Sequence, residues 1–431
     1  MAKMTMIIAF LTLACLFTGW PDAGAQGADE FKEELATLRE NIQGAIELEW
    51  ATIPPYLTAW LSIKDGTNKE VRDMLHGILM DEMYHMAMAA NLLNAIGGEP
   101  VLNDPDSAPS YPGQLPAGAL PKLNVTLEKM SRAHTKKVFM GIETPECEES
   151  VIKFFPHLSI ASNTNERSQN SEDAFLELSA KCDEEHYSPD TIGAIYIHKI
   201  LCPLKTLEDE AKKRGDTIFN GEPGRQISFS GQAYKVSDLS TAIKAVDLIL
   251  SEGEGGDPCN PYVDDNKKET CHYYKFAEIV RGREVNVTYG DNNCPSDDPG
   301  CDDFFSPCDG SVCEDEIAFS GLKVPFDESG VYPIIFNPST ELYPPDSEAR
   351  DLSDEFNKVY TDLMLCLHEA VNGYPEKMGH CKSLMRTLRD KGKKMVKEPI
   401  IPGGDPYFGP NVAPTYEFNY GAQEQQQHTE F

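Results

Sequence analysis

Positive charge is scarce in this sequence. Lys and Arg together number 38, against 70 Asp and Glu, so the formal net charge is -32 at pH 7. Binding to nucleic acid draws on clustered Lys and Arg, so this balance argues against a nucleic-acid partner. The excess of carboxylates instead favours solubility and attracts cations to the surface.

Long apolar runs are also missing, apart from one at the start. Lys3 precedes an apolar run over 6–17, and Ala23-Gly24-Ala25 follows it. This run is shorter than the roughly 20 residues that a membrane helix needs. The pattern is typical of a cleaved secretory signal over residues 1–25, with an uncleaved anchor as the alternative. We therefore expect a secreted protein without a membrane span.

Cysteine is more abundant than in most intracellular proteins, with twelve residues in total. One of them, Cys15, lies in the predicted signal, so an odd number remains. In a secreted chain, disulfides are favoured over a zinc site. We expect disulfides within the group Cys294, Cys301, Cys308 and Cys313, and one between Cys366 and Cys381 on two adjacent helices. Cys271 is expected to be the free thiol.

The segment around these four cysteines, residues 291–316, is acidic and rich in Gly and Pro. Its carboxylates are hard oxygen ligands, so a calcium site is one hypothesis and a solvated loop is the other. Two Asn-X-Thr sequons, at Asn124 and Asn286, are candidate glycosylation sites.

Helical periodicity divides the rest of the chain. Apolar stripes with alternating steps of three and four predict helices over 31–49, 71–96, 239–253 and from about 267 to 279. The first should bend or end at Pro54-Pro55. A long crossover over 99–236 joins the second helix to the third. A helical pair is predicted over 353–371 and 376–396.

Two long helices, a long crossover and two further helices are the arrangement of a ferritin-like four-helix bundle. We predict a mainly α protein with this bundle over 26–290, the acidic cysteine-rich loop over 291–316, a helical C-terminal segment over 317–400 and a partly disordered tail over 401–431.

Glu and His residues interrupt the apolar stripes of these helices. Glu49 lies on the first stripe, Glu82 and His85 are three apart on the second, and Glu269 and His272 are three apart on the fourth. Residues three apart share a helix face, so each such pair can reach one metal centre. The end of the third helix offers Glu252 or Glu254, and the spacing does not choose between them.

Chance also produces this spacing in an acidic chain, as at Asp73/His76 and Asp183/His186. Position distinguishes Glu82 and His85, because an unpaired carboxylate on an apolar stripe would cost several kcal/mol. A buried salt bridge without metal is the alternative explanation.

Two blocks of sequence resemble a known family. They are the stretch over 47–59, ELEWATIPPYLTA, and the stretch over 81–98, DEMYHMAMAANLLNAIGG. Both are similar to the ferritin-like domain of the iminophenylpyruvate dimer synthase family, and weaker matches spread over most of the mature chain. The resemblance implies a metal set of Glu49, Glu82, His85, Glu254, Glu269 and His272. The chain departs from the pattern at Ala194, where the family usually has an acid.

The resemblance implies a metal-dependent oxidoreductase that uses two iron ions, or another divalent transition metal, on a small organic substrate. The alternative is a non-catalytic secreted module that binds metal or a partner; a role in iron handling is a third and more remote possibility. The sequence does not indicate the substrate, the catalytic residues or the oligomeric state.

Overall fold

The computed structural model describes most of the chain. The described residues are 23–145, 182, 191–228, 235–253, 258–263, 269–287 and 317–420. The loop over 291–316, for which calcium binding is one hypothesis and disulfides are predicted, lies outside the described part of the chain. The predicted ligand Glu254 also lies outside it.

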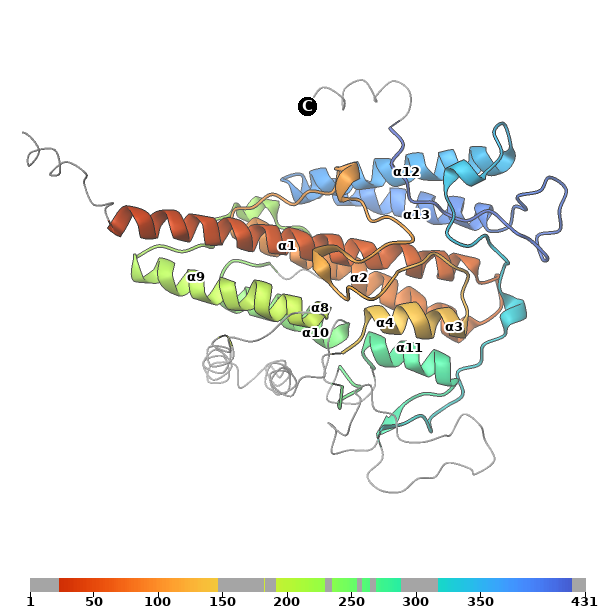
Figure 1. Ribbon diagram of the computed structural model, residues 1–431, viewed down its shortest axis with the longest axis horizontal. Helices are drawn as coiled ribbons and strands as arrows, with labels where there is room; N and C mark the ends of the chain where they lie inside the picture. Colours follow the sequence, from red (N-terminus) through yellow and green to blue (C-terminus); the bar gives the residue numbers. More distant parts are fainter. Residues whose placement is uncertain are drawn as a thin grey trace, which may run out of the picture.

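Two long helices form the centre of the molecule (Figure 1). Helix α1 spans Ala23–Ser62 and α2 spans Lys69–Ala95, and the two pack along each other. The predicted stripe residues Ile42, Leu75 and Ile78 are fully buried between the layers. Helix α2 agrees closely with its prediction and ends just before Gly97-Gly98.

Of the two outcomes predicted for Pro54 and Pro55, a bend or an end, the structure excludes the end, because helix α1 continues through both prolines. Proline has no N–H to donate, so Pro55 cannot bond the carbonyl of Ala51 within the helix. The hydroxyl of Tyr111 donates a hydrogen bond to that carbonyl at 2.7 Å. A side chain from the crossover thus satisfies one of the acceptors that the proline pair leaves open.

The other two positions of the bundle are occupied by interrupted helices. One consists of α3 (Arg132–His134), η3 (Thr135–Phe139) and α4 (Met140–Ile142), followed after a gap by α8 (Ile192–Ala194), η5 (Ile195–Leu201) and α9 (Cys202–Lys213). The other consists of α10 (Leu239–Glu252) and α11 (His272–Arg281). In Figure 1 the pieces of the first lie roughly end to end below α1.

The structure tests the predicted start of α10 and the predicted start of α11 separately. Helix α10 begins at Leu239, where its prediction placed it, and the Asp238 side chain caps it by accepting from the backbone of Thr241 in a capping box. Helix α11 begins later than predicted. Its N-cap is Cys271, and Glu269 precedes the helix.

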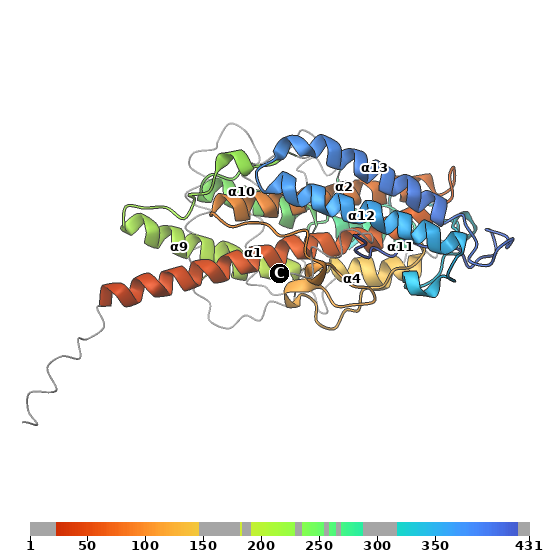
Figure 2. The ribbon, with the colours of Figure 1, turned by 90° about the horizontal axis from the view of Figure 1, so that it is seen from above.

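Helices α12 (Glu348–Val371) and α13 (Met378–Met395) cover the opposite face of the α1–α2 pair (Figure 2). The disulfide between Cys366 and Cys381 joins them, with Cα atoms 5.6 Å apart, as predicted. A second disulfide joins Cys182 to Cys202 at the start of α9. Cys271 is a free and buried cysteine, also as predicted.

Short elements complete the fold. Strands β1 (Asn286–Val287) and β2 (Ile317–Ala318) pair antiparallel, with Asn286 opposite Ala318. Short 3-10 helices lie at Pro105–Ser107, Pro116–Gly118, Pro223–Arg225, Glu328–Gly330, Thr340–Leu342 and Pro375–Lys377. The tail packs onto α12: Tyr416 is 4% exposed against Phe356, and the backbone of Asn419 donates a hydrogen bond to the Thr361 hydroxyl at 2.7 Å. None of the described helices is both long and apolar enough to cross a bilayer.

Candidate metal centre

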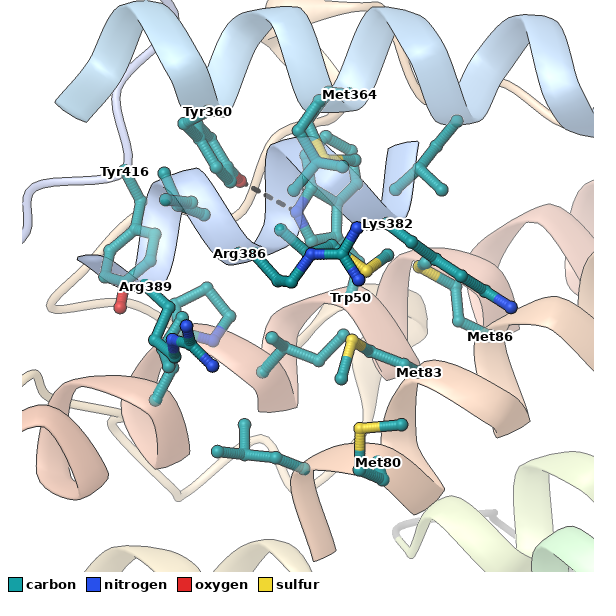
Figure 3. A pocket seen from close by; sticks show the side chains of 18 of the residues that line it. Trp50, Met80, Met83, Met86, Tyr360, Met364, Lys382, Arg386, Arg389 and Tyr416 are labelled. Atoms are coloured by element: carbon teal, nitrogen blue, oxygen red, sulfur yellow. Dashed lines mark hydrogen bonds between the residues drawn. The ribbon is translucent and has the colours of Figure 1, made fainter. Parts of the chain in front are cut away.

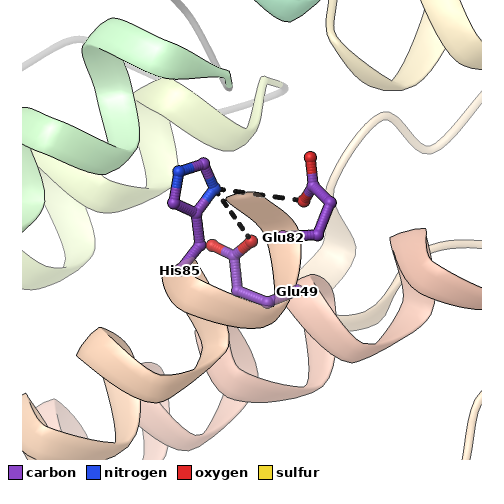
Figure 4. A group of neighbouring side chains, drawn as sticks. All are labelled: Glu49, Glu82 and His85. Atoms are coloured by element: carbon purple, nitrogen blue, oxygen red, sulfur yellow. Dashed lines mark ion pairs between the residues drawn. The ribbon is translucent and has the colours of Figure 1, made fainter. Parts of the chain in front are cut away.

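Helices α1 and α2 bring three chemically active side chains into the bundle interior (Figure 4). Glu49, Glu82 and His85 are at most 1% exposed. The Nδ1 atom of His85 lies 3.8 Å from Oε2 of Glu49 and 4.0 Å from Oε2 of Glu82. The Nε2 atom of the same ring lies 3.1 Å from Oε2 of Glu252, at the end of α10.

A second group is built around His272, the first residue of α11. Its Nδ1 atom lies 2.9 Å from Oε1 of Glu82 and 3.7 Å from Oε2 of Glu143, which follows α4. Its Nε2 atom lies 3.2 Å from Oδ2 of Asp81. His272 and Glu143 are fully buried.

The two groups are matched halves of one centre. Each has an imidazole whose Nδ1 faces inward and whose Nε2 meets an outer acid, and Glu82 presents one oxygen to each half. The rings of His85 and His272 are 5.7 Å apart and nearly parallel, with an interplanar angle of 29°. Two metal ions would therefore find separate donor groups here, with Glu82 available to both.

Each half also has one tyrosine that donates a hydrogen bond to its carboxylate. Tyr196 on η5 donates a short hydrogen bond to Oε1 of Glu49, and Tyr56 on α1 donates to Oε1 of Glu143 at 2.5 Å. In each case the other oxygen of the carboxylate faces the histidine of its own half. Each tyrosine therefore fixes the orientation of a carboxylate.

The charges of the centre depend on one another. Burial by itself lowers the pKa of His85, but its contacts with Glu252, Glu49 and Glu82 outweigh burial and raise it to about 9. The pKa of His272 is raised well above its usual value against the same effect of burial, by Asp81, Glu143 and Glu82. Burial and the charge of Glu82 raise the pKa of Glu143.

Both interrupted helices break at this centre. Glu143 and Thr191 lie on either side of one break, and Glu252 and His272 on either side of the other. Gly253, next to Glu252, has its backbone so close that a Cβ there would lie 2.9 Å from Nδ1 of His272 and 3.4 Å from Oε2 of Glu143. Space is thus kept open beside the donor atoms of the second half.

The donor set fits two metal ions. Each half supplies three ligand atoms within 4.8 Å of one another, from Glu49, Glu82 and His85 in one and from Glu82, Glu143 and His272 in the other. Within the described residues, Oε2 of Glu143 and Nδ1 of His272 are buried and make no hydrogen bond. Three buried carboxylates face two imidazoles, so the centre needs positive charge, which either protons or two divalent ions can supply.

Four of the six predicted ligands converge here, namely Glu49, Glu82, His85 and His272. The fifth, Glu269, is not brought to the centre. The expectation that Glu269 and His272 share a helix face is wrong, because the helix starts only at His272. Glu269 is exposed instead and lies 3.2 Å from Lys275.

The structure assigns roles that the sequence did not indicate. Glu143 completes the second half, and Glu252 contacts the outer nitrogen of His85 rather than the interior. Glu143 is four residues after Phe139 and eight after Thr135, both buried, but the π-helical turn over Thr135–Phe139 departs from the period of an α-helix, so the pattern was not recognised. Ala194 is buried two residues before Tyr196.

Known proteins resemble this chain to different extents. A family model described as Ferritin-like matches residues 42–281, which is more than half of the chain and includes all five candidate interior ligands. A solved ferritin-like protein from Caulobacter vibrioides is 19% identical over 83% of this chain and 94% of its own, with a TM-score of 0.44. No curated protein matches the chain.

Proposed function

The chain belongs to the ferritin-like family, and from this premise we propose that it is a secreted oxidoreductase that uses two iron ions to oxidise a small organic substrate. The observation that carries the proposal is the pair of matched half-sites that share Glu82. Paired carboxylate and imidazole donors of this kind suit iron, manganese and related divalent metals.

The interior ligands would be Glu49 and His85 for one ion, Glu143 and His272 for the other, and Glu82 between them. When bound, two redox-active ions would supply activation of dioxygen or peroxide. Asp81 and Glu252 hold the imidazoles with Nδ1 inward, which fixes the ring orientation. The tyrosines Tyr56 and Tyr196 restrict the rotation of the terminal carboxylates.

Aromatic packing keeps bulk water from the second half. The rings of Tyr56, Phe139 and Phe276 lie within 5.2 Å of one another, and Tyr56 also contacts Glu143. Exclusion of water strengthens electrostatic interactions at the centre.

Secretion and substrate class are supported by features outside the metal centre. Two disulfides among the described residues and the N-terminal pattern favour an oxidising compartment. A small organic substrate and oxidative coupling are suggested by the resemblance of the two blocks over 47–59 and 81–98 to the iminophenylpyruvate dimer synthase family.

The proposal is tested first by metal content. The mature chain, loaded with ferrous iron without oxygen and desalted, should retain about two ions per chain by elemental analysis. His85→Ala and His272→Ala should each lose most bound iron, whereas the exposed control His76→Ala should not. Absence of bound iron from the folded wild-type protein would overturn the proposal.

Exposure of the loaded protein to oxygen then separates catalysis from storage of metal. Oxygen consumption measured with an electrode, and a change in the optical spectrum, should occur in the wild type and be absent from both histidine variants. Stable binding of two ions without oxygen uptake would favour the non-catalytic metal-binding module.

A further inference from the structure

A cavity of about 320 Å³ lies on the other side of the α1–α2 pair, between it and α12–α13 (Figure 3). Its volume falls within the lower range of small-molecule sites. The metal centre is separated from it by the thickness of the helix pair. Successive residues face the two sites: Glu49 faces the centre and Trp50 the cavity, and Glu82 is followed by Met83.

The cavity wall is apolar and adaptable. Aromatic rings and methionines predominate, including Trp50, Trp60, Met80, Met83 and Tyr360. Methionine side chains change shape at low cost and make favourable contacts with rings and alkyl chains. The wall can therefore bind the apolar part of a ligand and adapt to ligands of different shape.

The rim is positively charged although the protein is strongly acidic. Lys382, Arg386 and Arg389 follow one face of α13 at steps of four and three, and the two arginines extend over the cavity in Figure 3. Arg389 also pairs with Asp390 at 2.8 Å. Within the described part of the chain, Arg386 forms no ion pair, and no acidic side chain is among those that line the cavity.

We propose that this cavity binds an amphiphilic monocarboxylate, with its apolar body between α2 and α12 and its carboxylate at Arg386. An arginine can bind a carboxylate through two parallel hydrogen bonds. Because its net charge is -32, the chain would otherwise repel such an anion, so the local cations on α13 account for its selection. The proposal is independent of any metal bound on the other side of α1–α2.

Intrinsic fluorescence reports on this site directly. The chain has three tryptophans, of which Trp50 and Trp60 line the cavity and Trp20 lies in the predicted signal. Titration of the mature protein with octanoate should give a saturable change in tryptophan emission, confirmed by calorimetry. Octan-1-ol should bind more weakly and octylammonium more weakly still, because the three probes differ only in the head group.

Variants separate the charge from the cavity. Arg386→Gln should weaken octanoate about tenfold and leave octan-1-ol unchanged, whereas Lys394→Gln, on the same helix but away from the cavity, should change neither. Leu363→Phe should fill the cavity and weaken both probes. Arg386→Gln alters an exposed side chain and should fold, so it decides the matter even if Leu363→Phe does not fold.

Two results would overturn the proposal. One is the absence of a saturable response to octanoate by both fluorescence and calorimetry. The other is equal affinity for octanoate and octan-1-ol that Arg386→Gln does not change. Repeating the titration with iron-free and iron-loaded protein keeps this result separate from the outcome of the metal test.

Discussion

The two faces of the α1–α2 pair carry opposite chemistry, although the same helical turns supply both. Toward the interrupted helices, Glu49, Glu82 and His85 are buried polar groups that contact one another. Toward α12–α13, Trp50 and Met83 line an apolar cavity. A rotation of about 100° per residue is enough to separate the two environments.

The faces also differ in what stabilises them. On the polar face, three buried carboxylates are stable only when bound protons or metal ions neutralise their charge. On the apolar face, burial of side chains and the Cys366–Cys381 disulfide stabilise the contact. Substitutions on the polar face should therefore alter metal binding, whereas substitutions on the apolar face should leave metal binding unchanged.

The largest effect is expected from Glu82→Gln. The shared carboxylate serves both halves, so its loss should remove nearly all bound iron rather than one ion of the two. Elemental analysis of the loaded variant measures this, with Glu70→Gln in the first turn of the same helix as the matched control. Retention of two ions would show that the halves do not share Glu82.

Gly253→Ala should affect only one half. The new Cβ would lie 2.9 Å from Nδ1 of His272, whereas the half around His85 keeps its space. We expect the iron content to fall from about two to about one per chain. Gly77→Ala is the control, because its Cβ would meet nothing within 4 Å. Unchanged iron content would mean that the α10 end moves aside.

The polar face of the metal-free protein should be sensitive to pH. The pKa of His85 is raised from 6.5 to about 9 in the folded state, so its contribution to stability is present below pH 6.5 and is lost as the pH rises through 9. The free energy of unfolding should fall by on the order of 3 kcal/mol at most across this window.

Urea unfolding of the metal-free wild type at several pH values measures this slope, and His85→Ala should flatten it. Bound iron should also flatten it, because a metal replaces the proton at the imidazole. An increase in stability toward pH 9 would contradict the assigned environment of His85.

On the apolar face, Cys366→Ala combined with Cys381→Ala should lower the free energy of unfolding by about 2–3 kcal/mol, because the unfolded chain loses a constraint over fifteen residues. Iron content should not change. A loss of iron would show that the packing of α12–α13 also affects the geometry of the metal centre. The two faces would then not be independent.

The same contrast explains how much the sequence could predict. Glu49, Glu82 and His85 lie on long uninterrupted helices, where periodicity alone determines which residues face inward. Glu143 and Glu269 lie next to breaks in helices, where no period continues across the gap. The bundle and four of the five interior residues were therefore predictable, whereas the position of Glu143 depends on the long-range placement of chain ends around Gly253.

The cavity could not have been predicted from periodicity for a related reason. Met80, Met83 and Met86 are ordinary core residues in any helical pattern, and only the packing of α12–α13 leaves a space beside them. The disulfide was predictable, because Cys366 and Cys381 lie on two helices joined by a short turn.

The smallest effect is expected from Tyr360→Phe, which tests whether the apolar face tolerates loss of a polar contact. The Nε1 of Trp50 donates to the Tyr360 hydroxyl at 2.8 Å in a buried position. Removal of the acceptor leaves a buried donor without it, which costs about 1–3 kcal/mol. The adjacent cavity has room for a water molecule beside Trp50, so we expect the lower end, about 1 kcal/mol. Tyr374→Phe, which alters an exposed ring, is the control for urea unfolding. Iron content should stay at the wild-type level, since Trp50 faces away from the centre; a loss of iron would show that its orientation also positions Glu49, the preceding residue on α1.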